Sequence, residues 1–133
     1  FAPVAAHLAR GLPPESMGRR LASFQKLSLP EPLLDGDELQ GKVLFVDPFG
    51  NLVTNILPSM LAKLGAGDGA LTAQVGGTLA PTRLLTTYGE AKQGEPLLVV
   101  GSSGLVEIAV NRGSAARFFQ ASRGAVLVLR RLR

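Results

Sequence analysis

The sequence contains no cysteine, and this absence excludes three kinds of chemistry together. Disulfide frameworks, thiolate catalysis and zinc sites built from cysteine all require that side chain. At 133 residues the chain can still bury an ordinary core without disulfides or metals, but it is too short for a second full domain. We therefore expect one folded domain without a metal site.

Long apolar runs are also missing. No stretch approaches the ~20 apolar residues that a membrane-spanning helix needs, and the amino terminus lacks the basic-then-apolar order of a signal peptide. Apolar residues still make up 46% of the chain against 18% charged residues, so burial can offset the entropy of ordering it. We expect a soluble, cytoplasmic protein with no membrane partner.

Aromatic residues are few, with six Phe, one Tyr and no Trp. The formal net charge of +4 raises the hypothesis of a small barrel that binds single-stranded nucleic acid, but such surfaces interleave aromatic with basic side chains. Here the basic excess is concentrated at the carboxy terminus and near Arg19 and Arg20, which favours a solvated basic surface. We expect no nucleic-acid partner.

Proline and glycine mark the organisation of the chain. Residues 1–10 have helical spacing, with Pro3 tolerable in a first turn and Gly11 placed to end the helix. Residues 12–37 carry four prolines and few periodic stretches, which is typical of an irregular connection. We predict an interdomain helix and proline-rich linker over residues 1–38, which once followed another segment, and a carboxy-terminal β domain over residues 39–133.

The second part of the chain has the alternation and turn residues of β structure. Gly76-Gly77 is a hairpin signal between two apolar stretches. Strands are predicted over residues 41–47, 52–56, 71–75, 79–88, 96–100, 106–110 and 125–132, and short helices over 58–64 and 114–120. This pattern predicts a mainly β fold, an antiparallel barrel or sandwich of about six or seven strands with two or three short helices.

One strand break carries an acid, a ring and an amide at close spacing. Asp47 follows an apolar strand, and Pro48 and Gly50 force the backbone to turn, so Phe49 and Asn51 project from the same corner. Such a corner can hold a cation, stack a flat ring and bind the edge of a base. The structural alternative is that the polar side chains form only turn hydrogen bonds and the ring fills the core.

A second break places two serines between glycines at Gly101–Gly104. Exposed amides and hydroxyls in such a loop can bind a carboxylate, as phosphate-binding loops bind their anion. The Lys-Ser/Thr pair of a P-loop is missing, and a plain hairpin turn explains the stretch equally well.

Together these segments resemble the S-adenosyl-L-methionine hydrolases, also called SAM hydroxide adenosyltransferases, which are related to the fluorinating and chlorinating adenosyl enzymes. The resemblance rests on Asp-Pro-Phe-Gly-Asn-Leu-Val-Thr-Asn-Ile at Asp47–Ile56, Gly-Ser-Ser-Gly at Gly101–Gly104 and Glu-Ile-Ala-Val-Asn-Arg-Gly-Ser-Ala-Ala at Glu107–Ala116. The opening Phe1–Ala6 resembles the junction between that family's two domains, so the likeness extends over essentially the whole chain.

The resemblance implies a homotrimer of two-domain subunits that binds substrate between neighbours. This chain corresponds to the carboxy-terminal domain and the junction. The family's water-activating Asp, Arg and His belong to the amino-terminal domain, upstream of Phe1, so we assign no catalytic residue here. His7 follows the junction and is expected to be structural or exposed.

The resemblance also implies the substrate-binding residues. Asp47 would pair with the ammonium of the methionine part, and Ser102 would contact its carboxylate. Phe49 would pack near the adenine while the Asn51 amide binds the adenine edge, an arrangement that suits an amide's paired donor and acceptor.

The backbone at Val110 and Arg112 would complete the adenine contacts. We include Ser103 in the site, although the halogenating relatives carry a basic side chain at its position. Those relatives also have one more residue between the acid and ring of the first block. Both differences favour hydrolysis over halide transfer.

The implied reaction is attack of hydroxide on the ribose 5′-carbon next to the sulfonium, with release of the methionine thioether. Because a cationic sulfur is already a good leaving group, the protein mainly aligns the nucleophile and excludes water, and no metal or redox cofactor is needed. The fragment alone is expected to be inactive. The alternative is a non-catalytic β domain that serves trimerisation or binding.

Overall fold

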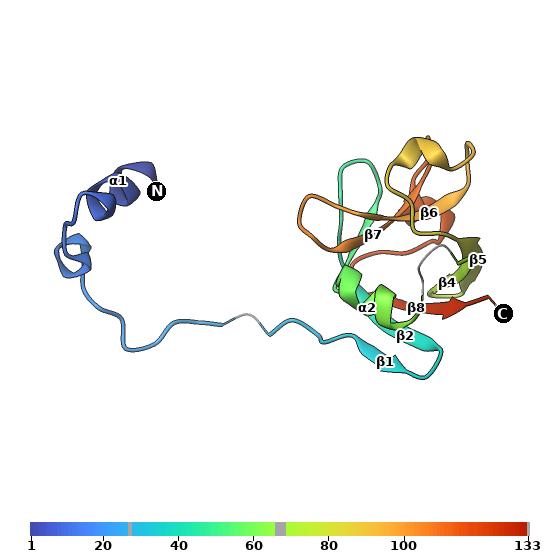
Figure 1. The fold of residues 1–133 in the computed structure, drawn as a ribbon, viewed down its shortest axis with the longest axis horizontal. Coiled ribbons are helices and arrows are strands. Elements are labelled where there is room, and N and C mark those ends of the chain that lie inside the picture. The colour runs from blue at the N-terminus through green and yellow to red at the C-terminus, as the bar shows by residue number, and fades with distance from the viewer. Residues whose placement is uncertain (27, 66–68, 133) are drawn as a thin grey trace.

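We describe the fold from a computed structural model of the chain, in which residues 1–26, 28–65 and 69–132 are described. Before the β domain, the described residues form two helical elements, α1 (Ala2–Ala9) and the 3-10 helix η1 (Pro14–Met17), neither of which buries a residue. Residues 18–26 and 28–32, which lie between these elements and the β domain, form no helix or strand (Figure 1). The predicted first helix is confirmed, with proline in its first turn.

The β domain is one antiparallel sheet that curls into a nearly closed barrel (Figure 1). Its strand order is β5-β4-β8-β2-β3-β7-β6, with β1 paired to β2. The two ends of this order meet through a single bridge between Leu84 and Leu98. The strands are β1 (Leu33–Asp35), β2 (Glu38–Val46), β3 (Leu52–Thr54), β4 (Leu71–Val75), β5 (Thr78–Thr82), β6 (Pro96–Val100), β7 (Val106–Val110) and β8 (Val126–Arg131).

The predicted fold class is confirmed, with one strand more than expected among the described residues. The additional strand, β1, lies at the end of the proline-rich stretch and forms a tight hairpin with β2 around Gly36. The strand predicted over residues 79–88 ends at Thr82, and its last part instead forms the 3-10 turn η2 (Tyr88–Glu90). The short helices are α2 (Pro58–Lys63) and α3 (Ala115–Phe118).

The core fills the barrel and follows directly from the sequence pattern. Along β2 every second residue from Leu39 to Val43 is buried, as expected for a strand with one face toward the core. The adjacent strands β3 and β7 are buried along their whole length. Each fully buried Leu or Ile contributes about 1.5–3 kcal/mol to stability, so these strands hold the neighbouring loops firmly.

This topology brings two distant loops together. The corner at residues 47–51 joins β2 to β3, and the loop at residues 101–105 joins β6 to β7. Because β3 pairs antiparallel with β7, the corner lies beside the segment that follows β7, and the loop at residues 101–105 lies at the other end of the same strand pair. The barrel therefore unites the sequence segments that carry the candidate side chains.

Candidate functional site

The corner after β2 is organised by the carboxylate of Asp47. Its Oδ1 accepts the backbone N–H groups of Phe49 at 2.9 Å and Asn51 at 2.8 Å, and its Oδ2 accepts the Asn51 side-chain amide at 2.9 Å. The backbone of Asp47 and Asn51 also pairs across the turn, with N to O at 3.0 Å. The turn hydrogen bonds of the structural alternative are therefore present, and they fix the orientation of both polar side chains.

The ring of Phe49 does not fill the core. It is 79% exposed, whereas Asn51 is only 7% exposed. That part of the structural alternative is wrong, because Pro48 and Gly50, whose φ is +89°, turn the backbone so that the ring faces outward. The corner thus presents an exposed aromatic face beside a fixed amide and a fixed carboxylate.

These side chains border one cleft of about 760 Å³. Six of the seven predicted site residues line it, and Ser103 does not. Residues from both loops and from η2 contribute to the walls. The lining consists of Asp47, Phe49, Asn51, Thr86, Thr87, Tyr88, Val99, Val100, Gly101, Ser102, Glu107, Val110, Arg112 and Gly113.

The serine loop is a tight hairpin connection. The N–H of Gly104 donates to the Gly101 carbonyl at 2.9 Å, and the N–H of Gly101 donates to the Leu105 carbonyl at 2.9 Å. Both serines are exposed, and neither hydroxyl has a hydrogen-bond partner within the part of the chain that is described. Only Ser102 reaches the cleft, since consecutive side chains in so short a turn point in different directions.

The segment after β7 offers main-chain groups to the cleft. Arg112 has a φ of 54°, a left-handed conformation that is uncommon for a residue with a side chain. Its N–H and C=O have no backbone partner among residues 1–26, 28–65 and 69–132. The loop is held from behind, because the side-chain amide of Asn111 donates to the Ala91 carbonyl at 2.7 Å. Val110, the last residue of β7, precedes this segment and is 7% exposed.

Among the cleft residues that the sequence did not assign to the site, Glu107 and Tyr88 are the titratable ones. Glu107 lies in β7 and is 8% exposed, and the Tyr88 hydroxyl donates to its Oε2 at a long 3.4 Å. Burial raises the pKa of Glu107 above its usual range, the nearby charge of Asp47 raises it further, and the bond from Tyr88 lowers it in part. Burial and the charge of Glu107 likewise raise the pKa of Tyr88.

Each of these residues had a sequence signal. Glu107 is the one charged residue in the apolar run of β7, which is unusual for a strand buried on both faces. Tyr88 is positioned by a capping box, in which Glu90 Oε1 accepts the Thr87 N–H at 2.9 Å and the Thr87 hydroxyl at 3.0 Å. The Thr-x-x-Glu spacing of that box is visible in the sequence.

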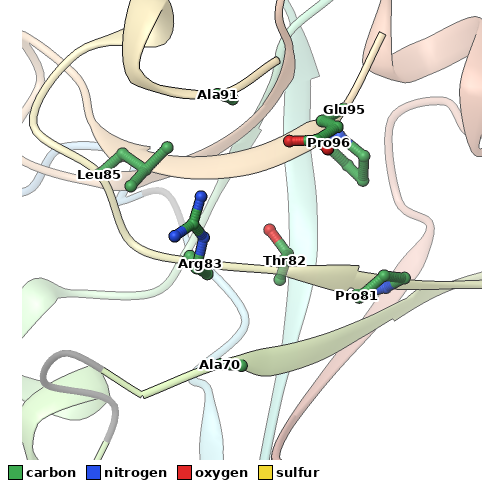
Figure 2. A pocket seen from close by; sticks show the side chains of 8 residues that line it. All are labelled: Ala70, Pro81, Thr82, Arg83, Leu85, Ala91, Glu95 and Pro96. Atoms are coloured by element: carbon green, nitrogen blue, oxygen red, sulfur yellow. The ribbon is translucent and has the colours of Figure 1, made fainter.

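A second, smaller cavity of about 310 Å³ lies where β5 and β6 come close without pairing. Figure 2 shows the hydroxyl of Thr82 and the guanidinium of Arg83 pointing from the end of β5 toward the segment with Glu95 and Pro96. Thr82 is 3% exposed, and its Oγ1 is buried without a hydrogen-bond partner in the described structure. The hydroxyl is therefore too covered to bind a ligand.

The lone hydroxyl of Thr82 predicts a stabilising substitution. A buried donor without a partner costs about 1–3 kcal/mol, so Thr82→Val is expected to raise the free energy of unfolding by about 1 kcal/mol. The matched control is Thr54→Val, because the Thr54 hydroxyl donates to the Val106 carbonyl at 2.6 Å and accepts the Ile56 N–H at 3.2 Å. Chemical denaturation should give opposite signs for the two variants, and equal signs would contradict the assignment.

The described residues contain no group of three or more His, Cys, Asp or Glu side chains placed to hold a metal ion. They also contain no helix that is both long enough and apolar enough to cross a membrane.

Comparison with known proteins found similar sequences and structures. Residues 41–128 match the family model of the SAM hydroxide adenosyltransferase C-terminal domain. The chain is 44% identical over 115 residues to the (R)-S-adenosyl-L-methionine hydrolase of Thermus thermophilus, covering 86% of this chain and 40% of that protein. It is 36% identical over 118 residues to the hydrolase of the same name from Salinispora tropica, covering 87% and 42%.

The similarity extends to halogenating enzymes and to solved structures. A fluorinase of Actinoplanes sp. is 34% identical over 125 residues, covering 84% of this chain and 40% of the enzyme. An uncharacterized conserved protein from Thermotoga maritima has a TM-score of 0.84 and 36% identity, covering 98% of this chain and 50% of that one. The chain thus spans about two fifths of the length of the curated relatives it matches.

Proposed function

We propose, because this chain belongs to the SAM hydroxide adenosyltransferase family, that it is the substrate-binding domain of an enzyme that hydrolyses S-adenosyl-L-methionine to adenosine and L-methionine. The observation that carries the proposal is the single cleft into which the exposed ring, the fixed amide, the carboxylate and the serine loop converge. This cleft combines a flat apolar surface for a base with charged and polar groups for an amino acid.

The adenine is assigned to the end of the cleft formed by the corner and the segment after β7. Phe49 offers an exposed ring on which a base can stack. Asn51 uses one amide hydrogen on Asp47, which leaves its carbonyl oxygen and its second hydrogen to bind the adenine edge. The unpaired main-chain groups of Arg112 are suited to the same edge, with Val110 beside them.

The methionine part is assigned to Asp47 and the serine loop. Asp47 keeps a fixed orientation through its three hydrogen bonds, so its carboxylate is preorganised to attract an ammonium group. Ser102 lines the same cleft with a free hydroxyl, which can donate to the substrate carboxylate. Ser103 lies outside the cleft and takes no direct part in this proposal.

The chemistry requires little from this domain beyond orientation. Hydroxide attacks the ribose 5′-carbon, the carbon–sulfur bond breaks, and its electron pair leaves with sulfur, which becomes the neutral thioether of methionine. Holding both ends of the substrate aligns that carbon for in-line attack and excludes water, and neither step requires a metal or redox cofactor. We expect the nucleophile to be activated by the amino-terminal domain of a cytoplasmic homotrimer.

The adenine assignment predicts the effect of Asn51→Ala. Loss of the amide should weaken adenosine binding to the full-length protein at least tenfold, since an unpaired polar edge costs about 1–3 kcal/mol. Isothermal titration calorimetry measures this directly. The control is Asn55→Ala, which removes another nearly buried amide, bonded to Lys42 and Pro30 and outside the cleft. Unchanged adenosine affinity in Asn51→Ala would defeat the assignment.

A non-catalytic assembly domain is the alternative function. It is favoured by apolar side chains exposed on the barrel, such as Phe45 at 50% and Leu79 at 61%. Light scattering combined with the adenosine titration separates the two functions. A stable trimer with no affinity for adenosine would favour assembly alone.

A further inference from the structure

The proline-rich segment before β1 becomes attached to the barrel at Pro30. None of the described residues before Pro30 is buried, and none of them forms a hydrogen bond with the described part of the β domain. The Pro30 carbonyl accepts the side-chain amide of Asn55 at 2.6 Å. Pro30 is therefore the first position at which this segment is held by the barrel, and Asn55 supplies the hydrogen bond that holds it.

Asn55 uses both ends of its side-chain amide. Its Oδ1 accepts the Lys42 N–H at 2.7 Å, and its backbone N–H donates to the Lys42 carbonyl at 3.1 Å, so Asn55 is paired to β2 just beyond the end of β3. Its Nδ2 is the donor to Pro30. Because Asn55 is only 9% exposed, water has little access to these bonds. The amide, with one acceptor and one donor side, thus joins β2 to the linker.

Gly41 leaves the space that this amide occupies. A Cβ built on Gly41 would lie 2.7 Å from Asn55 Oδ1 and 2.8 Å from Ile56 Cγ1, which is closer than real Cβ contacts. The backbone of Gly41 is not left-handed. Glycine is therefore required here by the close approach of Asn55 and Ile56, and β2 is shaped around the amide that contacts the linker.

The prolines allow one hydrogen bond to set the direction of the chain. Pro30 has no N–H, so its carbonyl is the main-chain group through which it can be held. The rings of Pro30 and Pro32 each fix φ at about −65°, and each ring disfavours helical backbone at the residue before it, Leu29 or Glu31. A direction set at the Pro30 carbonyl is therefore transmitted to the neighbouring residues of the linker.

A single short strand connects this contact to the cleft. Asn51, which lines the cleft, immediately precedes β3, and Asn55 immediately follows it. At about 3.3 Å per residue, the two amides are about 13 Å apart along the strand. β3 is buried along its whole length and pairs with both β2 and β7. The barrel therefore fixes the start of the linker relative to the cleft.

We propose that Asn55 is a positioning residue for the hydrolysis, because its hydrogen bond to Pro30 sets where the part of the protein before the linker lies relative to the cleft. This inference rests on the proposed function, in which the amino-terminal domain activates the nucleophile. Misplacement of reacting groups by about 1 Å can cost about 100-fold in rate. Asn55 does not line the cleft, so its loss should affect turnover and not ligand binding.

Asn55→Asp separates the two contacts of the amide. It keeps an oxygen that can accept the Lys42 N–H, but at neutral pH its second oxygen cannot donate to the Pro30 carbonyl and repels it. In the full-length protein, kcat for hydrolysis of S-adenosyl-L-methionine is expected to fall at least about tenfold.

Ligand affinity should remain nearly unchanged in Asn55→Asp. The calorimetric probes are S-adenosyl-L-homocysteine, which has the nucleoside and the amino acid of the substrate, and 5′-methylthioadenosine, which has no amino acid. Both affinities should change less than about twofold, because the substituted side chain lies outside the cleft.

Two further measurements show whether the linker contact alone is lost. The Lys42 N–H should stay protected from hydrogen exchange in Asn55→Asp and lose protection in Asn55→Ala. Trypsin cleavage after Lys26, shortly before the contact, should become at least about threefold faster in Asn55→Asp relative to cleavage after Lys42 within β2, which reports unfolding of the barrel. The matched control is Gln74→Glu, which makes the same change on β4 beside Arg130 and should alter none of these values.

Wild-type kcat or an unchanged cleavage ratio in Asn55→Asp would overturn the proposal. Equal losses of turnover and of affinity for both ligands would also overturn it, because Asn55 would then support the cleft itself. If the wild type neither binds these ligands nor hydrolyses S-adenosyl-L-methionine, the proposed function is wrong, and the cleavage ratio still decides whether Asn55 holds the linker.

Discussion

Replacing Asp47 with alanine is expected to weaken S-adenosyl-L-homocysteine binding about 100-fold and to lower the free energy of unfolding by about 2 kcal/mol. Two losses combine in this variant. The ammonium loses a preorganised carboxylate, and the corner loses the acceptor of three hydrogen bonds at 2.8–2.9 Å. Calorimetry of the full-length protein measures the first loss, and denaturant unfolding measures the second.

A second substitution separates these two losses. Asp47→Asn keeps an oxygen that can accept the backbone N–H groups of the corner, but it removes the charge. It should lose most of the S-adenosyl-L-homocysteine affinity and little stability, and its affinity for 5′-methylthioadenosine should stay near the wild-type value. If Asp47→Asn binds S-adenosyl-L-homocysteine as well as the wild type, the carboxylate serves the turn alone.

The local features of this fold could be predicted from the sequence because they depend on neighbouring residues. Proline and glycine end the strand at Asp47, and the glycine pair after Val75 produces the β4–β5 hairpin. The alternation of apolar residues along β2 identifies its buried face. Such signals arise from backbone sterics and side-chain period, so they do not require knowledge of the rest of the chain.

Pairing between distant strands could not be predicted in this way. The cleft exists because β3 pairs with β7, with Val53 opposite Glu107, and no local pattern specifies that register. From the sequence, only the family resemblance indicated that the corner and the serine loop belong to the same site. Whether Glu107 faces the cleft also depends on the register, which explains why a charged residue in an apolar strand was not assigned a role.

Two further differences between the sequence prediction and the structure arise from local features that the hydrophobic pattern does not reveal. The apolar and threonine-rich stretch from Leu79 predicts a long strand, but β5 ends at Thr82, and further along the stretch the capping box of Thr87 and Glu90 forms η2. Ser102 and Ser103 are adjacent residues of the same type, so the sequence pattern does not distinguish their roles. The tight turn between Gly101 and Gly104 directs only the first of them to the cleft.

Gly50→Ala is expected to be the most destabilising single substitution in the corner, lowering the free energy of unfolding by about 2–4 kcal/mol and abolishing measurable adenosine binding. Gly50 has a φ of +89°, and a Cβ built on it would overlap the Ser114 hydroxyl and lie 2.7 Å from the Ser114 Cβ. The Gly50 carbonyl also accepts the Ala116 N–H at 2.9 Å. The clash therefore pushes the corner away from α3.

Two comparisons isolate the steric part of this effect. Gly76→Ala has a similar left-handed backbone, with φ of +56°, but nothing lies within 4 Å of the added Cβ, so it should cost only about 1 kcal/mol of backbone strain. Ser114→Gly removes the clashing side chain and, as an N-cap change to glycine, costs a few tenths of a kcal/mol. Combining Ser114→Gly with Gly50→Ala should therefore restore more than half of the lost stability and recover adenosine binding. Additive losses in the double variant would show that the close approach of the corner to α3 is not what requires glycine at this position.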